Sequence, residues 1–185
     1  MAGTFILLLR GVNVGGRNRL PMADLRALVA GLGHGDVRTH LQSGNVVCTG
    51  SGEATGVAER LSSALRDELG LSVPVVARTG AEWSALTAAD PFGAGASAVV
   101  PPDESSLHVT FLAAPPGPEQ VAALEARASE FLPDRFAVVG PDVFLHVPGR
   151  YSETKLQNAL LERVLGKVAT TRNWRTVCAL AELAG

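Results

Sequence analysis

Arginine, glycine and asparagine gather between residues 10 and 19, directly after a short apolar run. The stretch reads Arg-Gly-Val-Asn-Val-Gly-Gly-Arg-Asn-Arg, and no acidic residue occurs before Asp24. Glycines allow backbone amides to face an anion, and arginine adds a positive charge with several donors. The stretch lacks the Gly-Lys-Ser/Thr of a P-loop and the Gly-x-Gly-x-x-Gly of dinucleotide-binding folds. We therefore predict an anion-binding loop with contacts from Arg10, Asn13, Gly15, Gly16 and Arg17.

The same loop also has a purely structural interpretation. Glycine and asparagine are common turn residues because they adopt backbone angles that other residues avoid. On the other hand, a strand-to-helix connection usually takes about 2–6 residues, and this one is longer. Excess length favours function, but both interpretations stay open.

A second polar motif, Gln42-Ser43-Gly44-Asn45, lies between two expected strands. Glycine and asparagine suffice for a hairpin turn, so a plain turn is the simpler interpretation. The side chains of Gln42, Ser43 and Asn45 are nevertheless more polar than a turn requires, and they are predicted as further ligand contacts.

A third polar motif, Thr170-Thr171-Arg172-Asn173-Trp174, is interpreted as the start of a final helix that runs from about Asn173 and is capped by Thr170 or Thr171. Free amides at a helix start suit a phosphate or carboxylate, so we predict contacts from Thr171, Arg172 and Asn173. Ordinary capping explains the motif equally well. Because a loop after the first strand and a hairpin turn can lie at opposite ends of a sheet, the sequence does not establish that the motifs converge.

Catalytic motifs are weak in this chain. Ser152-Glu153-Thr154-Lys155 has the Ser-x-x-Lys spacing of penicillin-binding enzymes, but Ser43-Gly44-Asn45 precedes it in reversed order and Lys-Thr-Gly is missing. We reject a nucleophilic serine and retain Lys155 as a further anion contact. The sequence has no paired carboxylates at a spacing typical of a hydrolase. Enzymatic activity and cofactor therefore stay undetermined.

The four histidines do not show the spacing of a metal site, and no metal is predicted. His108 and His146 lie in strand patterns; neighbours across a sheet is one interpretation, and two histidines that face solvent is the simpler one. Cys48 and Cys178 cannot form a disulfide framework, and both are expected to be buried as small apolar residues.

The composition is that of a globular protein. Of 185 residues, 46% are hydrophobic and 18% are charged, and the net charge is −2. The whole chain is therefore no polyelectrolyte, and only local patches can attract anions. The sequence shows no leader and no run of the ~18 apolar residues that a membrane span needs. We expect a cytoplasmic protein without a membrane partner.

The first half predicts a β-α-β-β-α-β order, the split ferredoxin-like unit. Pro21 and Gly33 bound a helix, and the hairpin strands meet at residues 42–44. The expected strands and helices are strands Thr4–Leu9, Val37–Leu41, Asn45–Thr49 and Val73–Arg78, with a helix after Pro21, one from Val57 to Leu69 and a short one over Ala81–Ala88.

The second half repeats this pattern in weaker form. Its expected elements are a strand Leu107–Leu112, a helix from Pro118 to Phe131, strands Phe136–Val139 and Val143–Val147, a helix closed by Gly166 and the final helix. We predict an α+β fold of two ferredoxin-like (split β-α-β) halves packed together, with mixed antiparallel sheets and helices on one face. The domain boundaries are 1–89, a Gly-, Ala- and Pro-rich linker at 90–105, and 106–185.

Four motifs in this order carry a family resemblance: Leu-Leu-Arg-Gly-Val-Asn-Val-Gly-Gly-Arg-Asn-Arg-Leu-Pro-Met at 8–22, Gln-Ser-Gly-Asn-Val-Val at 42–47, Thr-Lys-Leu at 154–156 and Ala-Thr-Thr-Arg-Asn-Trp at 169–174. They resemble a bacterial family called domain of unknown function 1697. Thr154 and Asp90 depart from the Ser and Asn expected there. The resemblance implies an α+β fold of two ferredoxin-like halves and transfers no activity.

The leading hypothesis is a protein that binds a small anionic, phosphate-containing ligand through the first loop and the Thr-Thr-Arg-Asn motif. Nucleic-acid backbone binding by the same loops is the alternative. Aromatic residues are only 5%, and Val46, Val47 and Cys48 replace the stacking aromatics that an RNA-recognition sheet needs. A third hypothesis is a protein-interaction or homodimer surface, and the oligomeric state stays undetermined.

Overall fold

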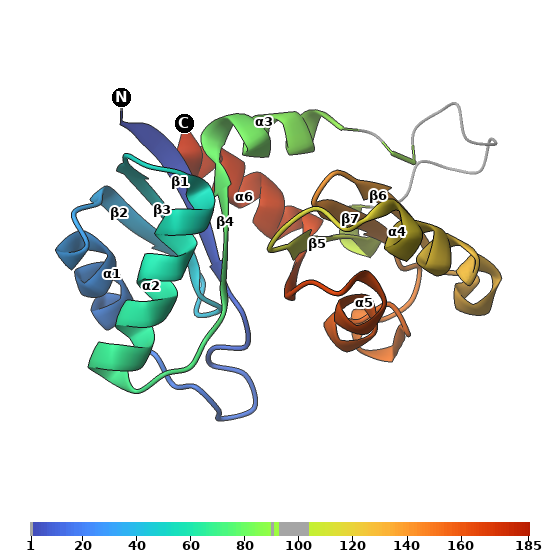
Figure 1. Ribbon diagram of the computed structural model, residues 1–185, viewed down its shortest axis with the longest axis horizontal. Helices are drawn as coiled ribbons and strands as arrows, with labels where there is room; N and C mark the ends of the chain where they lie inside the picture. The colour runs from blue at the N-terminus through green and yellow to red at the C-terminus, as the bar shows by residue number, and fades with distance from the viewer. Residues whose placement is uncertain (1, 90, 93–103) are drawn as a thin grey trace. The chain divides into compact units, whose positions relative to one another are not determined.

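A computed structural model describes residues 2–89, 91–92 and 104–185 of the chain. The chain divides into two units, Met1–Ala88 with Cys178–Gly185, and Ala89–Val177. Figure 1 colours the first unit mainly blue to green and the second mainly yellow to red. The sequence analysis assigns the residues from Cys178 onward to the second half, whereas the structure groups them with the first unit.

The first unit has a four-stranded antiparallel sheet in the order β2-β3-β1-β4. Two helices, α1 and α2, pack on one of its faces (Figure 1). Its elements are β1 (Gly3–Leu9), α1 (Met22–Gly31), β2 (Gly35–His40), β3 (Asn45–Gly50), α2 (Ala54–Leu69), β4 (Val75–Thr79) and α3 (Gly80–Ala88). This order confirms the predicted split unit.

The core of the first unit follows from the alternation of side chains along β1. Phe5, Leu7 and Leu9 contribute to the core beneath α1 and α2, together with Leu25 and Leu61 of those helices. Burying such side chains contributes about 1.5–3 kcal/mol each. The sheet is therefore a rigid support for the loops at both of its ends.

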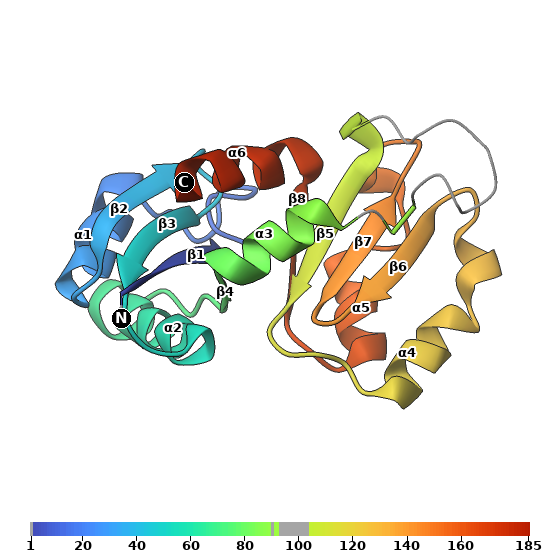
Figure 2. The same cartoon turned by 90° about the horizontal axis from the view of Figure 1, so that it is seen from above.

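The second unit has the same topology, with an antiparallel sheet in the order β6-β7-β5-β8 (Figure 2). Its elements are η1 (Glu104–Ser106), β5 (Leu107–Leu112), α4 (Pro118–Glu125), η2 (Ala128–Phe131), β6 (Arg135–Val139), β7 (Asp142–His146), η3 (Tyr151–Glu153), α5 (Asn158–Leu165) and β8 (Ala169–Asn173). Helix α6 (Trp174–Ala184) begins in this unit, and its residues from Cys178 onward belong to the first. The resemblance between the sequence patterns of the two halves therefore reflects a repeated fold.

Two expectations for the second unit are wrong in detail. The helix expected from Pro118 to Phe131 ends at Glu125, and a separate 3-10 turn covers Ala128–Phe131. Strand β8 occupies residues that the sequence analysis gives to the start of a helix. Most of the predicted linker lies outside the described residues, apart from Ala89, Pro91 and Phe92 at its start and Glu104 and Ser105 at its end.

Two kinds of feature are absent from the described residues. No helix there is both long and apolar enough to cross a membrane. No group of three or more His, Cys, Asp or Glu is arranged to hold a metal ion in that part of the chain. Cys48 is buried as expected, and burial raises its thiol pKa to about 11, whereas Cys178 is only partly buried.

Candidate functional site

The loop between β1 and α1 folds back on itself as a miniature hairpin. The Arg17 amide donates to the Val14 carbonyl at 3.0 Å, and the Asn13 amide donates to the Asn18 carbonyl at 3.1 Å. Gly15 and Gly16 form the tip with φ angles of 57° and 76°. Two successive positive φ angles define the mirror-image turn that suits a Gly-Gly pair. The glycines are therefore required by the loop's shape.

Two asparagines hold this loop in place. The Asn13 side chain donates to the Leu20 and Gln42 carbonyls at 2.9 and 2.7 Å and accepts from the Leu20 amide at 2.8 Å. The Asn18 side chain donates to the Gly11 carbonyl at 3.0 Å. Both asparagines have a positive φ, which asparagine tolerates better than most residues. The amide of Asn13, a predicted ligand contact, is thus already engaged within the chain.

The loop and the turn between β2 and β3 lie side by side at one end of the first sheet (Figure 1). Antiparallel pairing of β1 with β3 sets Leu8 opposite Asn45, so the end of one strand meets the start of the other. The Leu9 amide donates to the Gly44 carbonyl at 2.9 Å. Two of the three predicted polar motifs therefore converge.

The turn itself is closely packed. A Cβ atom at Gly44 would lie 2.6 Å from Val12 Cγ2 and 2.7 Å from Leu9 Cβ, so no larger residue fits. The Asn45 side chain is fully buried and donates to the His40 carbonyl and to Ser43 Oγ at 3.0 and 2.9 Å. Asn45 therefore closes the turn.

The arginines of the loop face solvent. Arg17 and Arg19 are exposed, and Arg10 is partly buried. Gly15 and Gly16 are exposed as well, and their amides make no hydrogen bond within residues 2–89, 91–92 and 104–185. Two large apolar side chains stand beside them, Val14 with 63% and Leu41 with 59% of its surface exposed. Positive charge, amide donors and apolar surface thus occur together at this end of the first unit.

Most of the third predicted motif lies in a strand that directly precedes the final helix. Thr171, Arg172 and Asn173 belong to β8, where each residue pairs with one on β5. Thr171 Oγ1 lies 2.7 Å from Thr110 Oγ1 and donates to Asn158 Oδ1 at 2.7 Å. This hydroxyl is therefore already engaged inside the second unit.

Arg172 and Asn173 also bond within the second unit. Arg172 donates to the Thr170 hydroxyl and the Thr171 carbonyl at 2.8 and 2.9 Å, and burial lowers its pKa to about 10. Asn173 Oδ1 accepts from the Thr176 amide at 2.9 Å, which is the geometry of an N-cap. The cap of α6 is therefore Asn173, and the predicted caps Thr170 and Thr171 are wrong.

Lys155 lines a cavity of about 280 Å³ in the second unit. Its ammonium donates to the Glu130 carbonyl at 3.2 Å. In the same cavity the buried Thr154 hydroxyl donates to Asp134 Oδ2 at 2.5 Å and accepts from the Leu156 amide at 3.0 Å. Arg127 and Lys155 hold the pKa of Glu130 below its usual value, chiefly through the hydrogen bonds from Arg127. Acidic and basic side chains both line this cavity, so it has no clear preference for anions.

The predicted neighbours His108 and His146 occupy adjacent strands, where His108 pairs with Leu145 and His146 with Leu107. The His108 ring stacks on Tyr151, with centroids 4.6 Å apart. Neither His108 Nδ1 nor the Tyr151 hydroxyl has a hydrogen-bond partner among the described residues. Burial lowers the pKa of His108 and raises that of Tyr151. This stacking could not be predicted from the sequence, because His108 in β5 and Tyr151 in η3 are far apart along the chain.

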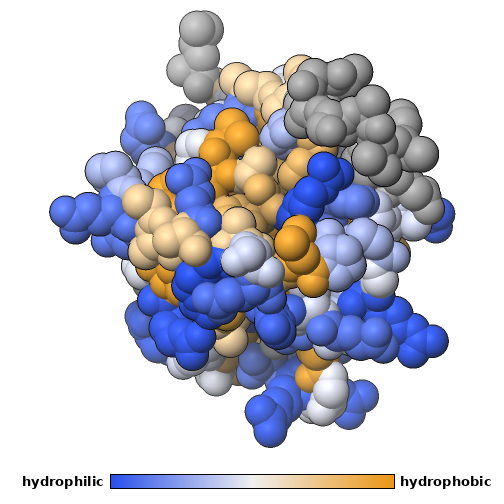
Figure 3. Space-filling view, turned by 90° about the vertical axis from the view of Figure 1, so that its right-hand side faces the viewer, coloured by the Kyte–Doolittle hydropathy of each residue, from blue (hydrophilic) through white to orange (hydrophobic). Residues whose placement is uncertain are grey.

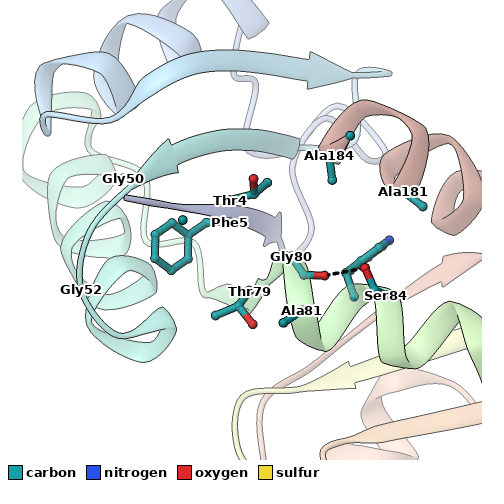
Figure 4. Close-up of a pocket in the computed structure, with 13 residues that line it drawn as sticks. Thr4, Phe5, Gly50, Gly52, Thr79, Gly80, Ala81, Ser84, Ala181 and Ala184 are labelled. Carbon is teal, nitrogen blue, oxygen red and sulfur yellow. Dashed lines mark hydrogen bonds between the residues drawn. The ribbon is translucent and has the colours of Figure 1, made fainter. Parts of the chain in front are cut away.

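A cavity of about 460 Å³ lies at the other end of the first sheet, where β1 begins (Figure 4). Thr4, Gly80, Ser84, Ala181 and Ala184 line it, and Ser84 donates to the Gly80 carbonyl at 3.0 Å. None of the side chains along it carries a charge. The neighbouring start of α3 is satisfied internally, since the amide and hydroxyl of Thr79 donate to Glu82. The cavity therefore has room for a ligand but no charged side chain to bind one.

The family match agrees with the resemblance noted in the sequence. Residues 2–144 match the family described as a protein of unknown function, DUF1697, and the chain belongs to that family. Lys155 and the Thr170–Asn173 motif lie beyond the matched span. A search of the curated proteins finds none that matches.

One solved structure is similar over its whole length. It is described as the conserved bacterial protein SP0830 from Streptococcus pneumoniae, with 21% sequence identity, complete coverage of both chains and a TM-score of 0.78. At that identity the likeness supports the α+β fold of two similar halves, and it says nothing about a ligand.

Proposed function

We propose that the first unit binds a small ligand carrying a phosphate group, at the surface formed by residues 10–19 and the turn at 41–45. The observation that supports this most is that hydrogen bonds from Asn13 and Asn18 hold a loop on which Arg17 and Arg19 stay exposed. A loop fixed before binding loses less conformational entropy when the ligand arrives. A loop that served only to connect β1 to α1 would need neither these hydrogen bonds nor the arginines.

Each residue has a separate role in this proposal. The Gly15 and Gly16 amides and the Arg17 guanidinium donate to phosphate oxygens, because charge-assisted bonds to an anion are the strongest available on an exposed surface. Arg19 adds a second guanidinium; Arg10, Gln42 and Ser43 are second-tier contacts. Asn13 and Asn45 position the loop and turn and do not touch the ligand.

The residues predicted in the second unit are left out of this proposal. Thr171, Arg172 and Asn173 bond along β8 or at the start of α6, and Lys155 bonds to the Glu130 carbonyl. Each of these side chains therefore already makes hydrogen bonds within the second unit. The expected cytoplasmic location stays a prediction.

Nucleic-acid backbone is the second candidate ligand. Arg17 and Arg19 are exposed, and the two cavities described above are lined by residues outside the loop. A long polyanion reaches such a surface as easily as a small molecule does. Salt separates the two ligands, since backbone binding weakens steeply as counterions are released.

The test is a titration of the full chain with inorganic phosphate, ATP and a single-stranded oligonucleotide, at low and at moderate salt. Arg17→Ala and Arg19→Ala should each weaken binding about tenfold, since a hydrogen bond to a charged group contributes about 1.5–3 kcal/mol. Arg66→Ala is the control, because Arg66 is an exposed arginine of α2 that pairs with Asp67 at 3.0 Å. Absence of binding to all three probes, or equal loss in Arg66→Ala, would overturn the proposal.

A further inference from the structure

A groove in the second unit runs along the edge of its sheet. It is a cavity of about 510 Å³, lined by Pro91, Phe92, Glu125, Ala128, Ser129, Leu132 and residues 134–138. Residues 135–138 are consecutive in β6, and consecutive strand residues point to opposite faces of a sheet. A cavity that touches all four therefore follows the edge of the strand.

The groove consequently adjoins the backbone of an edge strand. In the sheet order β6-β7-β5-β8, β6 lies at one end and pairs only with β7 among the described strands. An edge strand turns a row of N–H and C=O groups away from its sheet. These groups are the donors and acceptors that a further strand would use.

Two walls stand beside this edge. One is η2 and the residue after it, where Leu132 leaves 69% of its surface exposed. The other is Phe92, whose ring lies 6.2 Å from the His146 ring and 5.5 Å from the Arg135 guanidinium carbon. The charge of Arg135 is thereby held against Phe92. Figure 3 views the molecule from the side on which Figure 1 draws α4 and β6, and apolar residues lie open on that face.

We propose that the groove binds an extended peptide segment of another protein, which adds to the sheet as a strand beside β6. Main-chain hydrogen bonds supply affinity in this mode, and alternate side chains supply specificity. The peptide should carry apolar residues at alternate positions, because the walls are Leu132 and Phe92. The exposed Glu125 at the rim favours a basic residue beside them.

The residues that line the groove favour a free peptide over a second copy of the chain. The β6 strand of a second copy would bring its own η2 turn and Phe92 to the same edge, whereas a free peptide brings only its backbone and side chains. At about 3.3 Å per residue, about five residues suffice to follow β6 along its length. This inference concerns the second unit and is independent of the phosphate surface.

The probe is a labelled peptide, Lys-Val-Thr-Val-Thr-Val-Lys, titrated into the full chain and followed by fluorescence anisotropy. The matched control is the same peptide with alternate backbone nitrogens methylated, which keeps its composition but removes donors. We expect the methylated peptide to bind at least about tenfold more weakly, since each lost hydrogen bond contributes about 0.5–1.5 kcal/mol. Hydrogen exchange should show slower exchange in β6 when the first peptide is bound.

A pair of variants tests whether the peptide binds in the groove. Ser129→Trp fills the groove from the exposed wall, and Ser51→Trp adds the same bulk at an exposed position of the first unit. Binding should be lost in the first variant only. The proposal is overturned if the peptide does not bind, if methylation or Ser129→Trp leaves its affinity unchanged, or if Ser129→Trp instead converts a dimer into a monomer, which would identify a second copy as the occupant.

Discussion

The two units have the same strand order but different chemistry at corresponding positions of their central strand pairs. Leu7 faces Ala77 across β1 and β4 in the first unit, and Thr110 faces Thr171 across β5 and β8 in the second. The first pair is apolar and part of the core, whereas the second is joined by a hydrogen bond of 2.7 Å. Since one topology accommodates both pairs, the fold does not require the polar one.

The connections that leave the first strand of each unit differ in the same way. Residues 10–21 lie between β1 and α1, but only residues 113–117 lie between β5 and α4. The short version shows that this topology needs no more than a few residues there. The additional length of the first loop, with its arginines, is therefore the best candidate for function in the first unit. In the second unit, by contrast, the distinctive polar pair of Thr110 and Thr171 lies within the sheet.

Substituting a glycine in the hairpin turn of each unit should give the largest loss of stability and the clearest difference between the two units. Gly44→Ala should destabilise the protein by about 3 kcal/mol, from a left-handed backbone and an overpacked contact. Gly44 has a φ of 72°, and its added Cβ would meet Val12 and Leu9. Urea unfolding of the full chain measures the change.

The matched variant for that measurement is Gly140→Ala, in the β6–β7 turn. Gly140 has a φ of 59°, but nothing lies within 4 Å of an added Cβ. Only the backbone term remains, so the loss should be about 1 kcal/mol. Equal losses in the two variants would show that the packing of the turn against the loop is unimportant.

Removing the brace of the loop should have the next largest effect. Asn13→Ala deletes three hydrogen bonds to Leu20 and Gln42, and a loss of about 2 kcal/mol is expected from partly buried bonds. Amide exchange between Val14 and Arg17 should accelerate, and phosphate affinity should fall with it. Asn13→Gly, which restores freedom of φ but no hydrogen bonds, is the control. Recovery of full stability by glycine would mean that the side-chain bonds contribute nothing.

The hydroxyl pair of the second unit gives a smaller effect. Thr171→Val removes both the partner of Thr110 and the donor to Asn158, so it should cost about 1.5 kcal/mol. Thr110→Val leaves the bond to Asn158 in place and should cost about 1 kcal/mol. Thermal unfolding of both single variants and the double variant measures their coupling. Strict additivity would contradict a shared hydrogen bond, because interacting residues show a coupling energy.

Most of the fold could be predicted from local patterns. The apolar run before Arg10 predicted β1, Pro21 marked the start of α1, and the polar residues at 42–45 marked a hairpin turn. Each of these signals depends on neighbours in the sequence. The miniature hairpin of the loop also follows from its own Gly-Gly pair.

What could not be predicted depends on contacts between distant residues. Thr170 and Thr171 suit either a helix cap or a strand, and only their pairing with Phe111 and Thr110 makes them part of β8. The approach of the loop to the turn follows from the register of β1 with β3, which periodicity does not reveal. The groove beside β6 needs both an edge strand and the η2 wall, so no local motif announces it.

The smallest effect expected concerns pH and the partly buried His108 of the second unit. Burial lowers the pKa of His108 from its ordinary 6.5, and the interaction of its ring with the backbone of Ser106 partly opposes this by favouring the protonated form. Between that lowered pKa and 6.5 the unfolded chain binds more protons than the folded one. The contribution of His108 to stability is therefore complete above pH 6.5 and declines as the pH falls through this window. His108→Gln should flatten the dependence when unfolding free energies are compared at about pH 7.5 and about pH 5.5. His146→Gln should flatten it as well, since burial and then the charge of Arg135 lower the pKa of His146. An unchanged slope in both variants would place the pH dependence outside this sheet.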